Sequence, residues 1–264
     1  MIGSMTPAER ASAVAFALKN CALENMTPGP ETLRAAVAYE RGAIGMGRLT
    51  AIADGESASS NGRDHRAGDV SKDTSADRAS SLFARNVLLP EHGWRATGDL
   101  AELTAIHTIL FTGVFDDAGT LRTMNAPRRD GSDKAAPEPF FPTQLIETGA
   151  ANIAMELAER RNLACLDRID FIRRLAAIHD ELGYLHPFTG GNAMTLRVFA
   201  SRLAHDAGWD LDWSPVTREA YQTAKYKAYR GDTHAFERIF AAAVRPANPT
   251  RVFLIAGWEQ GPAH

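Results

Sequence analysis

The sequence predicts a mainly α-helical fold in which a small helical unit precedes a larger helical domain. Alanine is abundant and runs of β-branched residues are few, which disfavours extended sheet. Apolar residues recur at helical spacing in several separate segments, and a stretch rich in Ser, Asp, Gly and Arg separates the first of them from the rest. With 264 residues, of which 45% are hydrophobic and 23% charged, the chain is long enough for one medium and one small globular unit.

The small unit covers residues 5–53. Thr6 can cap a helix whose first position is Pro7 and whose third is Glu9, a combination typical of a helix start. The Thr-Pro-Gly-Pro break at residues 27–30 then stops that helix, because neither proline nor glycine continues a helix well. We expect three helices here: one from Thr6 to the break, a second over residues 31–41 that stops at Gly42, and a short third over residues 46–53.

A linker is predicted over residues 54–80. This stretch holds almost no large apolar side chains, so it cannot bury enough surface to order itself. A flexible linker of about 27 residues has a root-mean-square reach on the order of 30 Å. That reach is sufficient to fold the small unit back onto the larger domain.

The larger domain covers residues 81–245 and is expected to consist of helices joined by short turns. Its clearest apolar stripe contains Leu103, Ile106 and Leu110. The expected helices cover residues 100–114, 143–161, 167–183 and 195–207, with a last helical region over 215–244. Residues 246–264 form a C-terminal tail, in which the apolar run 252–255 is a candidate edge strand.

Charge, hydropathy and cysteine content limit the partners and the compartment. The net charge of -3 gives no general attraction to nucleic acid, and the basic and aromatic run at residues 225–230 is more typical of an amphipathic helix face. Nucleic acid is therefore not an expected partner. Two cysteines fit a reducing environment, and neither a membrane-spanning run nor a secretory signal is visible. We expect a cytoplasmic protein with no membrane partner, and leave export into a host cell open.

The spacing of potential ligands predicts no structural zinc site. The eight histidines show no His-x-x-x-His pattern and the two cysteines no Cys-x-x-Cys pattern. His179 and Asp180 are adjacent on an expected helix, and we interpret them as a surface pair rather than as part of a catalytic triad.

The most informative stretch runs from His186 to Arg197 and reads His-Pro-Phe-Thr-Gly-Gly-Asn-Ala-Met-Thr-Leu-Arg. A glycine-rich turn that leads into a helix presents backbone N–H groups and the positive end of the helix dipole to an anion such as phosphate. Gly190, Gly191 and Asn192 would form this cradle. His186 stands just before the turn, where it can take a proton from a hydroxyl that attacks the bound phosphate.

This stretch resembles the signature of the Fic (Fido) domain family, His-Pro-Phe-x-(Asp/Glu)-Gly-Asn-Gly-Arg-x-x-Arg. Family members mostly move AMP from ATP onto a side-chain hydroxyl of another protein. The similarity continues upstream and downstream of the signature, over about 165 residues in the expected order. It implies a Fic-type helical core with a small β-hairpin flap, His186 as general base and Arg197 as a phosphate contact. Phe140 and Phe141 lie where family members carry the flap that aligns the target.

The signature departs from the family pattern at three positions. Gly190 replaces the Asp or Glu that holds Mg²⁺ at the nucleotide phosphates, so the resemblance implies weak or absent magnesium binding, and we assign no metal ligand. Met194 replaces the first arginine, and Ala193 replaces a glycine of the turn. Because each charge-assisted contact is worth about 1.5–3 kcal/mol, these losses predict a slow reaction or an unusual donor.

A second resemblance lies in the small unit. Residues 20–25, Asn-Cys-Ala-Leu-Glu-Asn, look like the inhibitory motif (Ser/Thr)-x-x-x-Glu-(Gly/Asn) of small antitoxins that pair with Fic toxins. The resemblance implies that Glu24 pairs with Arg197 and obstructs the γ-phosphate, with Asn20 at the Ser/Thr position. The small unit would then be an antitoxin-like intramolecular partner, which the linker keeps at high effective concentration. The alternative interpretation is an ordinary helix end followed by a Pro-Gly turn.

Two functions are consistent with these resemblances. The first is a Fic-type transferase that moves a nucleotide, with ATP as the expected donor, or a related phosphate-linked group onto a Ser, Thr or Tyr hydroxyl of an unidentified target protein, and that is held inactive by the fused helix. The second is a pseudo-Fic protein, a binding module that has kept the flap and lost the chemistry. His186 favours the first function, whereas Gly190 and Met194 favour the second. A homodimer, in which the inhibitory helix reaches into a neighbour, is left open.

Overall fold

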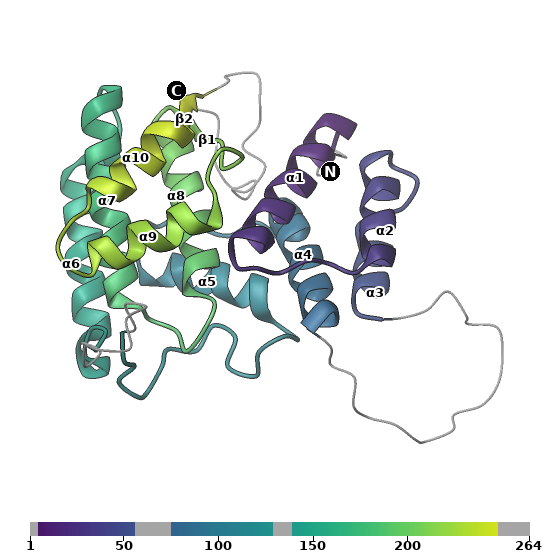
Figure 1. The fold of residues 1–264 in the computed structure, drawn as a ribbon, viewed down its shortest axis with the longest axis horizontal. Coiled ribbons are helices and arrows are strands. Elements are labelled where there is room, and N and C mark those ends of the chain that lie inside the picture. Colours follow the sequence, from purple (N-terminus) through teal and green to yellow (C-terminus); the bar gives the residue numbers. More distant parts are fainter. Residues whose placement is uncertain (1–4, 56–74, 129–138, 248–264) are drawn as a thin grey trace. The chain divides into compact units, whose positions relative to one another are not determined.

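The computed structural model confirms a mainly helical protein and describes residues 5–55, 75–128 and 139–247. The chain divides into two compact units, residues 1–89 and 90–264. Figure 1 labels the helices and strands of both units. None of the helices in the described ranges is both long and apolar enough to cross a membrane.

The first unit contains four helices. They are α1 (Pro7–Leu23), α2 (Pro30–Glu40), α3 (Met46–Ala53) and α4 (Ser75–His92), the last of which continues into the second unit. The start of α1 is the predicted one, because the Thr6 side chain accepts from the Glu9 N–H and the Glu9 carboxylate accepts from the Thr6 N–H. Helix α1 ends at Leu23, before the predicted break at residues 27–30, and Pro30, the last residue of the break, is the first residue of α2.

Helix α4 corrects the predicted boundary of the linker. The expected linker over 54–80 lies mostly in residues 56–74, outside the described residues, but residues 75–80 belong to α4. Along the sequence, the second unit begins at Pro90 rather than at residue 81. Sequence reasoning missed this helix because its first turn is polar, whereas the later residues Leu82, Phe83 and Val87 are fully buried.

Three polar contacts attach α4 to the other helices of the first unit. The Asn20 amide of α1 donates to the Asn86 side-chain oxygen at 2.7 Å. The Gly29 N–H donates to the Ser80 hydroxyl at 2.9 Å. At the end of α3, Asp54 forms a salt bridge with Arg85 at 2.9 Å, and the neighbouring Arg85 and Ser81 donors hold the pKa of this carboxyl below its usual value despite the opposing effect of burial. Helix α4 is therefore part of the small unit's own fold.

The second unit is built from α5 (Leu100–Phe111), α6 (Ile146–Glu159), α7 (Arg168–Leu185), α8 (Asn192–Asp206), α9 (Arg218–Ala228) and α10 (His234–Ala243). Two 3₁₀ turns, Thr143–Leu145 and Arg161–Leu163, flank α6. Helix α7 packs against α6, α8 and α10, and α5 packs against α8 (Figure 1). Side-chain caps at Asp99, Asp167 and Thr217 begin α5, α7 and α9.

Two short strands complete this unit. Strands β1 (Trp209–Leu211) and β2 (Val244–Pro246) pair antiparallel, with Asp210 opposite Arg245. The candidate edge strand over residues 252–255 lies outside the described residues.

Several helix boundaries differ from the predicted ones. Helix α5 ends at Phe111 rather than at Val114, and α6 covers Ile146–Glu159 rather than 143–161. Helix α7 continues through Gly183 to Leu185, because a glycine without a positive φ does not end a helix. Helix α8 begins at Asn192, three residues before the expected start at Thr195. The expected region 215–244 is split into α9 and α10 by a turn in which Gly231 has φ 83°.

Candidate active site

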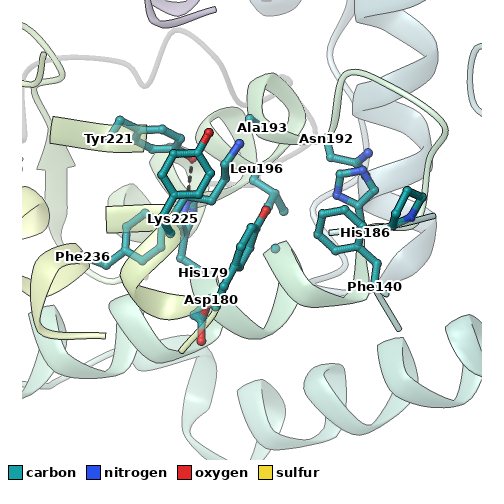
Figure 2. Close-up of a pocket in the computed structure, with 14 residues that line it drawn as sticks. Phe140, His179, Asp180, His186, Asn192, Ala193, Leu196, Tyr221, Lys225 and Phe236 are labelled. Atoms are coloured by element: carbon teal, nitrogen blue, oxygen red, sulfur yellow. Dashed lines mark hydrogen bonds between the residues drawn. The ribbon is translucent and has the colours of Figure 1, made fainter. Parts of the chain in front are cut away.

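A cavity of about 320 Å³ lies where the end of α7, the start of α8 and helix α9 meet in the second unit. Figure 2 shows its lining, in which His186 and Phe140 face Lys225 and Tyr221 across the cavity. This volume is in the range of a small-molecule site, and its walls combine aromatic rings with a few polar groups. The cavity also reaches Asn192 and Ala193, the first residues of α8.

His186 ends helix α7 in a left-handed conformation, with φ 45° and ψ 60°. A non-glycine residue is uncommon there, and the conformation turns the chain from α7 into the glycine-rich loop. Its imidazole stacks on the ring of Phe140, with ring centres 3.8 Å apart (Figure 2). Burial, together with the charges of Arg122 and Lys225, lowers the pKa of His186 to about 4. The ring is therefore neutral at pH 7 and able to accept a proton.

Arg122 holds the backbone around His186. Its buried guanidinium donates to four carbonyl oxygens: those of His186 at 2.7 Å, Met124 at 3.0 Å, Leu185 at 3.3 Å, and Phe141. An arginine that makes four hydrogen bonds to main-chain oxygens fixes the geometry of the chain rather than neutralising a carboxylate. One side chain thus joins the end of α7, which carries the predicted base, to the segment that carries the predicted flap.

The glycine-rich loop is closed by Asn192. Its side-chain oxygen accepts from the Phe188 N–H at 3.1 Å, and its amide donates to the Phe188 carbonyl at 2.8 Å. Gly191 precedes α8 with φ 74°, and no side chain caps this helix. A Cβ on Gly191 would lie 2.4 Å from the ring of Phe111, so only glycine fits. The predicted cradle is thus a fixed turn, with the backbone groups at the start of α8 uncapped by side chains.

His107 supports the same loop from helix α5. Its Nδ1 accepts from the Gly119 N–H at 2.8 Å, so Nε2 carries the hydrogen and donates to the Gly190 carbonyl at 3.0 Å. The ring also stacks on Phe188, with centres 3.9 Å apart. Burial lowers the pKa of His107 below its ordinary value, which favours this neutral form. The carbonyl of Gly190 is thereby held against α5.

Gly190 leaves the site without a carboxylate at the metal position of the family signature. Across residues 5–55, 75–128 and 139–247, no group of three or more His, Cys, Asp or Glu side chains could hold a metal ion. Gly190 itself, at the metal position of the signature, has no side-chain oxygen to offer Mg²⁺. A Cβ on Gly190 would make only ordinary contact with Phe115, at 3.4 Å, and the residue has no positive φ. Its backbone therefore does not require glycine.

Arg197 and Met194 are both buried within α8. The Arg197 guanidinium lies 5.0 Å from the ring centre of Tyr221, and Tyr221 lines the cavity. Neither Arg197 nor Met194 is among the described residues that line the cavity. Arg197 lies behind Tyr221, a residue of the cavity wall, and does not itself line the cavity. Its phosphate-binding role therefore stays a prediction.

His179 is not the surface residue that the sequence suggested. It is buried on α7, and its Nε2 lies 2.8 Å from the Tyr221 hydroxyl. Burial and the charge of Arg197 lower its pKa to about 3. Its ring also contacts Phe236 and Phe240 of α10 edge-on. The interpretation as a surface pair was wrong, because the helical stripe that contains His179 faces the core.

The predicted flap begins and ends in described residues. Pro127 and Pro139 form an isolated antiparallel bridge, and the Phe140 N–H donates to the Ala126 carbonyl at 2.9 Å. Residues 129–138 between them lie outside the described residues. Phe140 lines the cavity, whereas the Phe141 N–H donates to the Tyr184 carbonyl at 3.1 Å, which joins the segment to α7.

Asn20 and Glu24, the predicted inhibitory pair, lie near the end of α1 in the first unit. Glu24 is the C-cap residue of α1, and the following Asn25 has φ 60°. Asn20 is buried and donates to Asn86 of α4. The helix end of the ordinary interpretation is present, but the turn lies at Glu24 and Asn25 rather than at Pro28 and Gly29. The inhibitory role of Glu24 stays a prediction.

Several residues of the site were not assigned roles from the sequence. Arg122 and His107 are distant from the signature in sequence, and each donates to it at backbone oxygens. Lys225, Tyr226 and Tyr229 were interpreted as an amphipathic face, but all three line the cavity. The sequence offered one signal for these residues, their basic and aromatic composition. That composition does not show that they lie beside the signature in the fold.

Comparison with known proteins places these features in a family. A model of the Fic/DOC family matches residues 97–204. The probable protein adenylyltransferase Fic of Escherichia coli K12 is 32% identical over 148 residues, which cover 56% of this chain and 70% of that protein. Protein adenylyltransferase VbhT of Bartonella schoenbuchensis is 32% identical over 159 residues, or 60% of this chain but only 32% of VbhT.

A solved structure shows the same likeness. The N-terminal Fic domain of a putative cell filamentation protein of Bartonella quintana, with bound ADP, superposes with a TM-score of 0.58 at 26% identity. The superposition covers 64% of this chain and 84% of that one. The family match extends from just before α5 to the last turn of α8. It therefore includes His107 and Arg122, which donate to the backbone around the glycine-rich loop.

Proposed function

This chain belongs to the Fic/DOC family, and we propose that it is a protein nucleotidyltransferase that moves AMP from ATP onto a hydroxyl side chain of another protein. The observation that carries the proposal is the neutral His186 beside the uncapped start of α8, in one cavity. The relatives named protein adenylyltransferases and the neighbouring structure with bound ADP support this donor class.

The proposed reaction is a single displacement at phosphorus. The target hydroxyl oxygen attacks the α-phosphorus of ATP, a P–O bond forms to the target, and the bond to the bridging oxygen breaks with release of pyrophosphate. His186 takes the hydroxyl proton. One ring nitrogen of His186 donates to the Gly183 carbonyl, which leaves the other to accept that proton.

The chain's own groups would stabilise the charge of the transferring phosphate. The backbone N–H groups in the first turn of α8 point toward the cavity end of that helix, where the dipole favours an anion. Arg122, His107 and Asn192 hold the loop in place before the donor arrives, because their hydrogen bonds are made within the protein. Magnesium is assigned no step, since the protein offers it no carboxylate at Gly190.

Inhibition by the first unit is part of the proposal. Glu24, with Asn20 at the first position of the motif, would pair with Arg197 and hinder seating of the γ-phosphate. The support is the sequence resemblance together with the position of Glu24 at the end of α1. Partners other than the target and this intramolecular segment, including a second copy of the chain, are not needed for the mechanism.

The first experiment uses the full chain with Glu24→Gly, incubated in lysate with labelled ATP, CTP, GTP and UTP in turn. We expect label from ATP on a target protein, and no label when His186→Ala is added to the same background. The low pKa of His186 predicts that the rate stays constant from pH 8 to pH 5 and falls only as the pH approaches about 4. A rate that halves near pH 6.5 would show that burial does not lower the pKa of the base, and only the loss of label in His186→Ala would then support His186 as that base.

A second candidate function is favoured by Gly190 and Met194, which remove two electrostatic partners of the donor. In this case the chain is a pseudo-Fic binding module that uses the cavity without transfer. The lysate experiment separates the two functions, because no label that depends on His186, from any of the four nucleotides, supports the binding module.

A further inference from the structure

Lys225 is the one lysine or arginine among the described residues that line the cavity. It lies on α9, outside the signature stretch, and shares the cavity with His186, Ala193 and Leu196 (Figure 2). Its ammonium group lies 5.6 Å from the ring centre of Tyr226, which also lines the cavity. A cation therefore reaches the site from a helix that the signature does not include.

Three nearby arginines do not line the cavity, and the carboxylate that does has the wrong sign for a phosphate. Arg122 donates to four backbone carbonyls, and Arg197 is fully buried against Tyr221 and is absent from the described lining. Asp180 is the one carboxylate among the described lining residues, and burial raises its pKa. His186 is neutral at pH 7. Arg128 lies beside the cavity, with its guanidinium 4.6 Å from the ring centre of Tyr229, and donates to the Tyr229 carbonyl at 2.9 Å. Among the described residues that line the cavity itself, Lys225 is the cation.

Lys225 lines the same cavity as His186 and lies close enough to influence its pKa. The positive charge of Lys225 contributes to the lowered pKa of His186, after burial and the charge of Arg122. An ammonium group placed within electrostatic range of His186 is also within range of a phosphate that His186 serves. Lysine binds phosphate as a point charge and needs no fixed fork geometry, which suits a flexible side chain on a cavity wall.

We infer that Lys225 is the phosphate-binding cation of this site, and that it allows the chain to bind a nucleoside diphosphate or triphosphate without magnesium. This inference rests on the proposed function. It explains how an anion can bind at the start of α8 when Gly190 offers no metal ligand and Met194 offers no charge. The start of α8 and Lys225 would hold the phosphates between them, with the nucleoside in the aromatic part of the cavity.

The experiment measures binding of ADP and of adenosine to the full chain by calorimetry, once with EDTA and once with Mg²⁺. We expect the wild-type chain to bind ADP about equally in both buffers. Lys225→Met should weaken ADP binding by about tenfold or more and leave adenosine binding within about twofold, because a charge-assisted contact to phosphate is lost and the nucleoside contacts remain. Lys225→Arg should keep most of the ADP affinity. Lys227→Met is the matched control, since Lys227 is exposed on the same helix and does not line the cavity.

The outcomes separate the two proposals. Equal ADP binding by wild type and Lys225→Met overturns the role of Lys225 and leaves the proposed function standing. ADP binding that requires Mg²⁺ overturns the metal-independent part of the inference. A parallel loss of ADP and adenosine binding in Lys225→Met shows a structural role instead and also overturns it. If the wild-type chain binds neither ligand, the proposed function is wrong, and the inference about Lys225 fails with it.

Discussion

Replacement of Arg122 by methionine should both destabilise the second unit and abolish transfer. The side chain makes four hydrogen bonds to main-chain oxygens, and methionine keeps its apolar stem while removing every donor. Hydrogen bonds from a charged donor are worth about 1.5–3 kcal/mol each, but water can reach some of the freed carbonyls, so we expect a loss of about 3–5 kcal/mol. Arg122→Lys should recover part of it, because lysine offers three donors without the planar fork.

Urea unfolding followed by tryptophan fluorescence measures this loss directly. All four tryptophans lie beyond residue 90, so the signal reports on the second unit. Arg174→Met is the control, since Arg174 is exposed on α7, and a change there should stay within about 0.5 kcal/mol. The reasoning is refuted if Arg122→Met costs less than about 1 kcal/mol and the Glu24→Gly background still transfers label at a rate within about twofold of its parent.

Three further predictions concern the glycine-rich loop and the core behind it. Gly191→Ala should cost about 1–3 kcal/mol in the same urea assay and weaken ADP binding, because a Cβ would meet the Phe111 ring at 2.4 Å; an unchanged midpoint would contradict this. Gly190→Glu should make ADP binding stronger in Mg²⁺ than in EDTA, whereas Gly190→Gln should not; an ADP affinity of the glutamate variant that is insensitive to Mg²⁺ would show that a missing carboxylate is not the reason for weak metal binding. His179 has a folded pKa of about 3, below the ordinary value of 6.5, so the unfolded chain binds protons first and stability is lost as the pH falls below 6.5. At pH 5 this one group should have cost about 2 kcal/mol relative to pH 7.5, and His179→Gln should show a shallower dependence of unfolding free energy on pH.

The helical fold could be predicted because its signals are local. The capping box at Thr6 and the apolar spacing around Leu103 each fall within a few residues, and the corresponding helices are present. Helix α4 was missed because its first turn is polar, and only tertiary burial of its later residues makes it part of a core. Strands β1 and β2 are three residues long and more than 30 residues apart in sequence, so no local sequence pattern predicts that they pair.

The site could be predicted only as far as its residues are contiguous in sequence. His186, Gly191 and Asn192 come together because one turn carries them. Lys225 and Arg122 enter from other elements, and their contribution depends on packing that a single sequence does not display. The signature predicted the kind of chemistry. The residues outside the signature that hold or complete the site could be identified only from the structure.

The attachment of α4 to α1 and α3 changes what a break in the chain would do. A single cut within residues 56–74 removes the covalent connection between α3 and α4, but leaves in place the contacts of Asn20 with Asn86, Gly29 with Ser80, and Asp54 with Arg85. The small unit is therefore a split fold: α1 to α3 precede the cut, and α4 is carried by the same fragment as the second unit. After such a cut the two pieces would behave as complementary fragments of one module, and dissociation of α1 to α3 from α4, rather than cleavage, would set how long α1 to α3 stay bound.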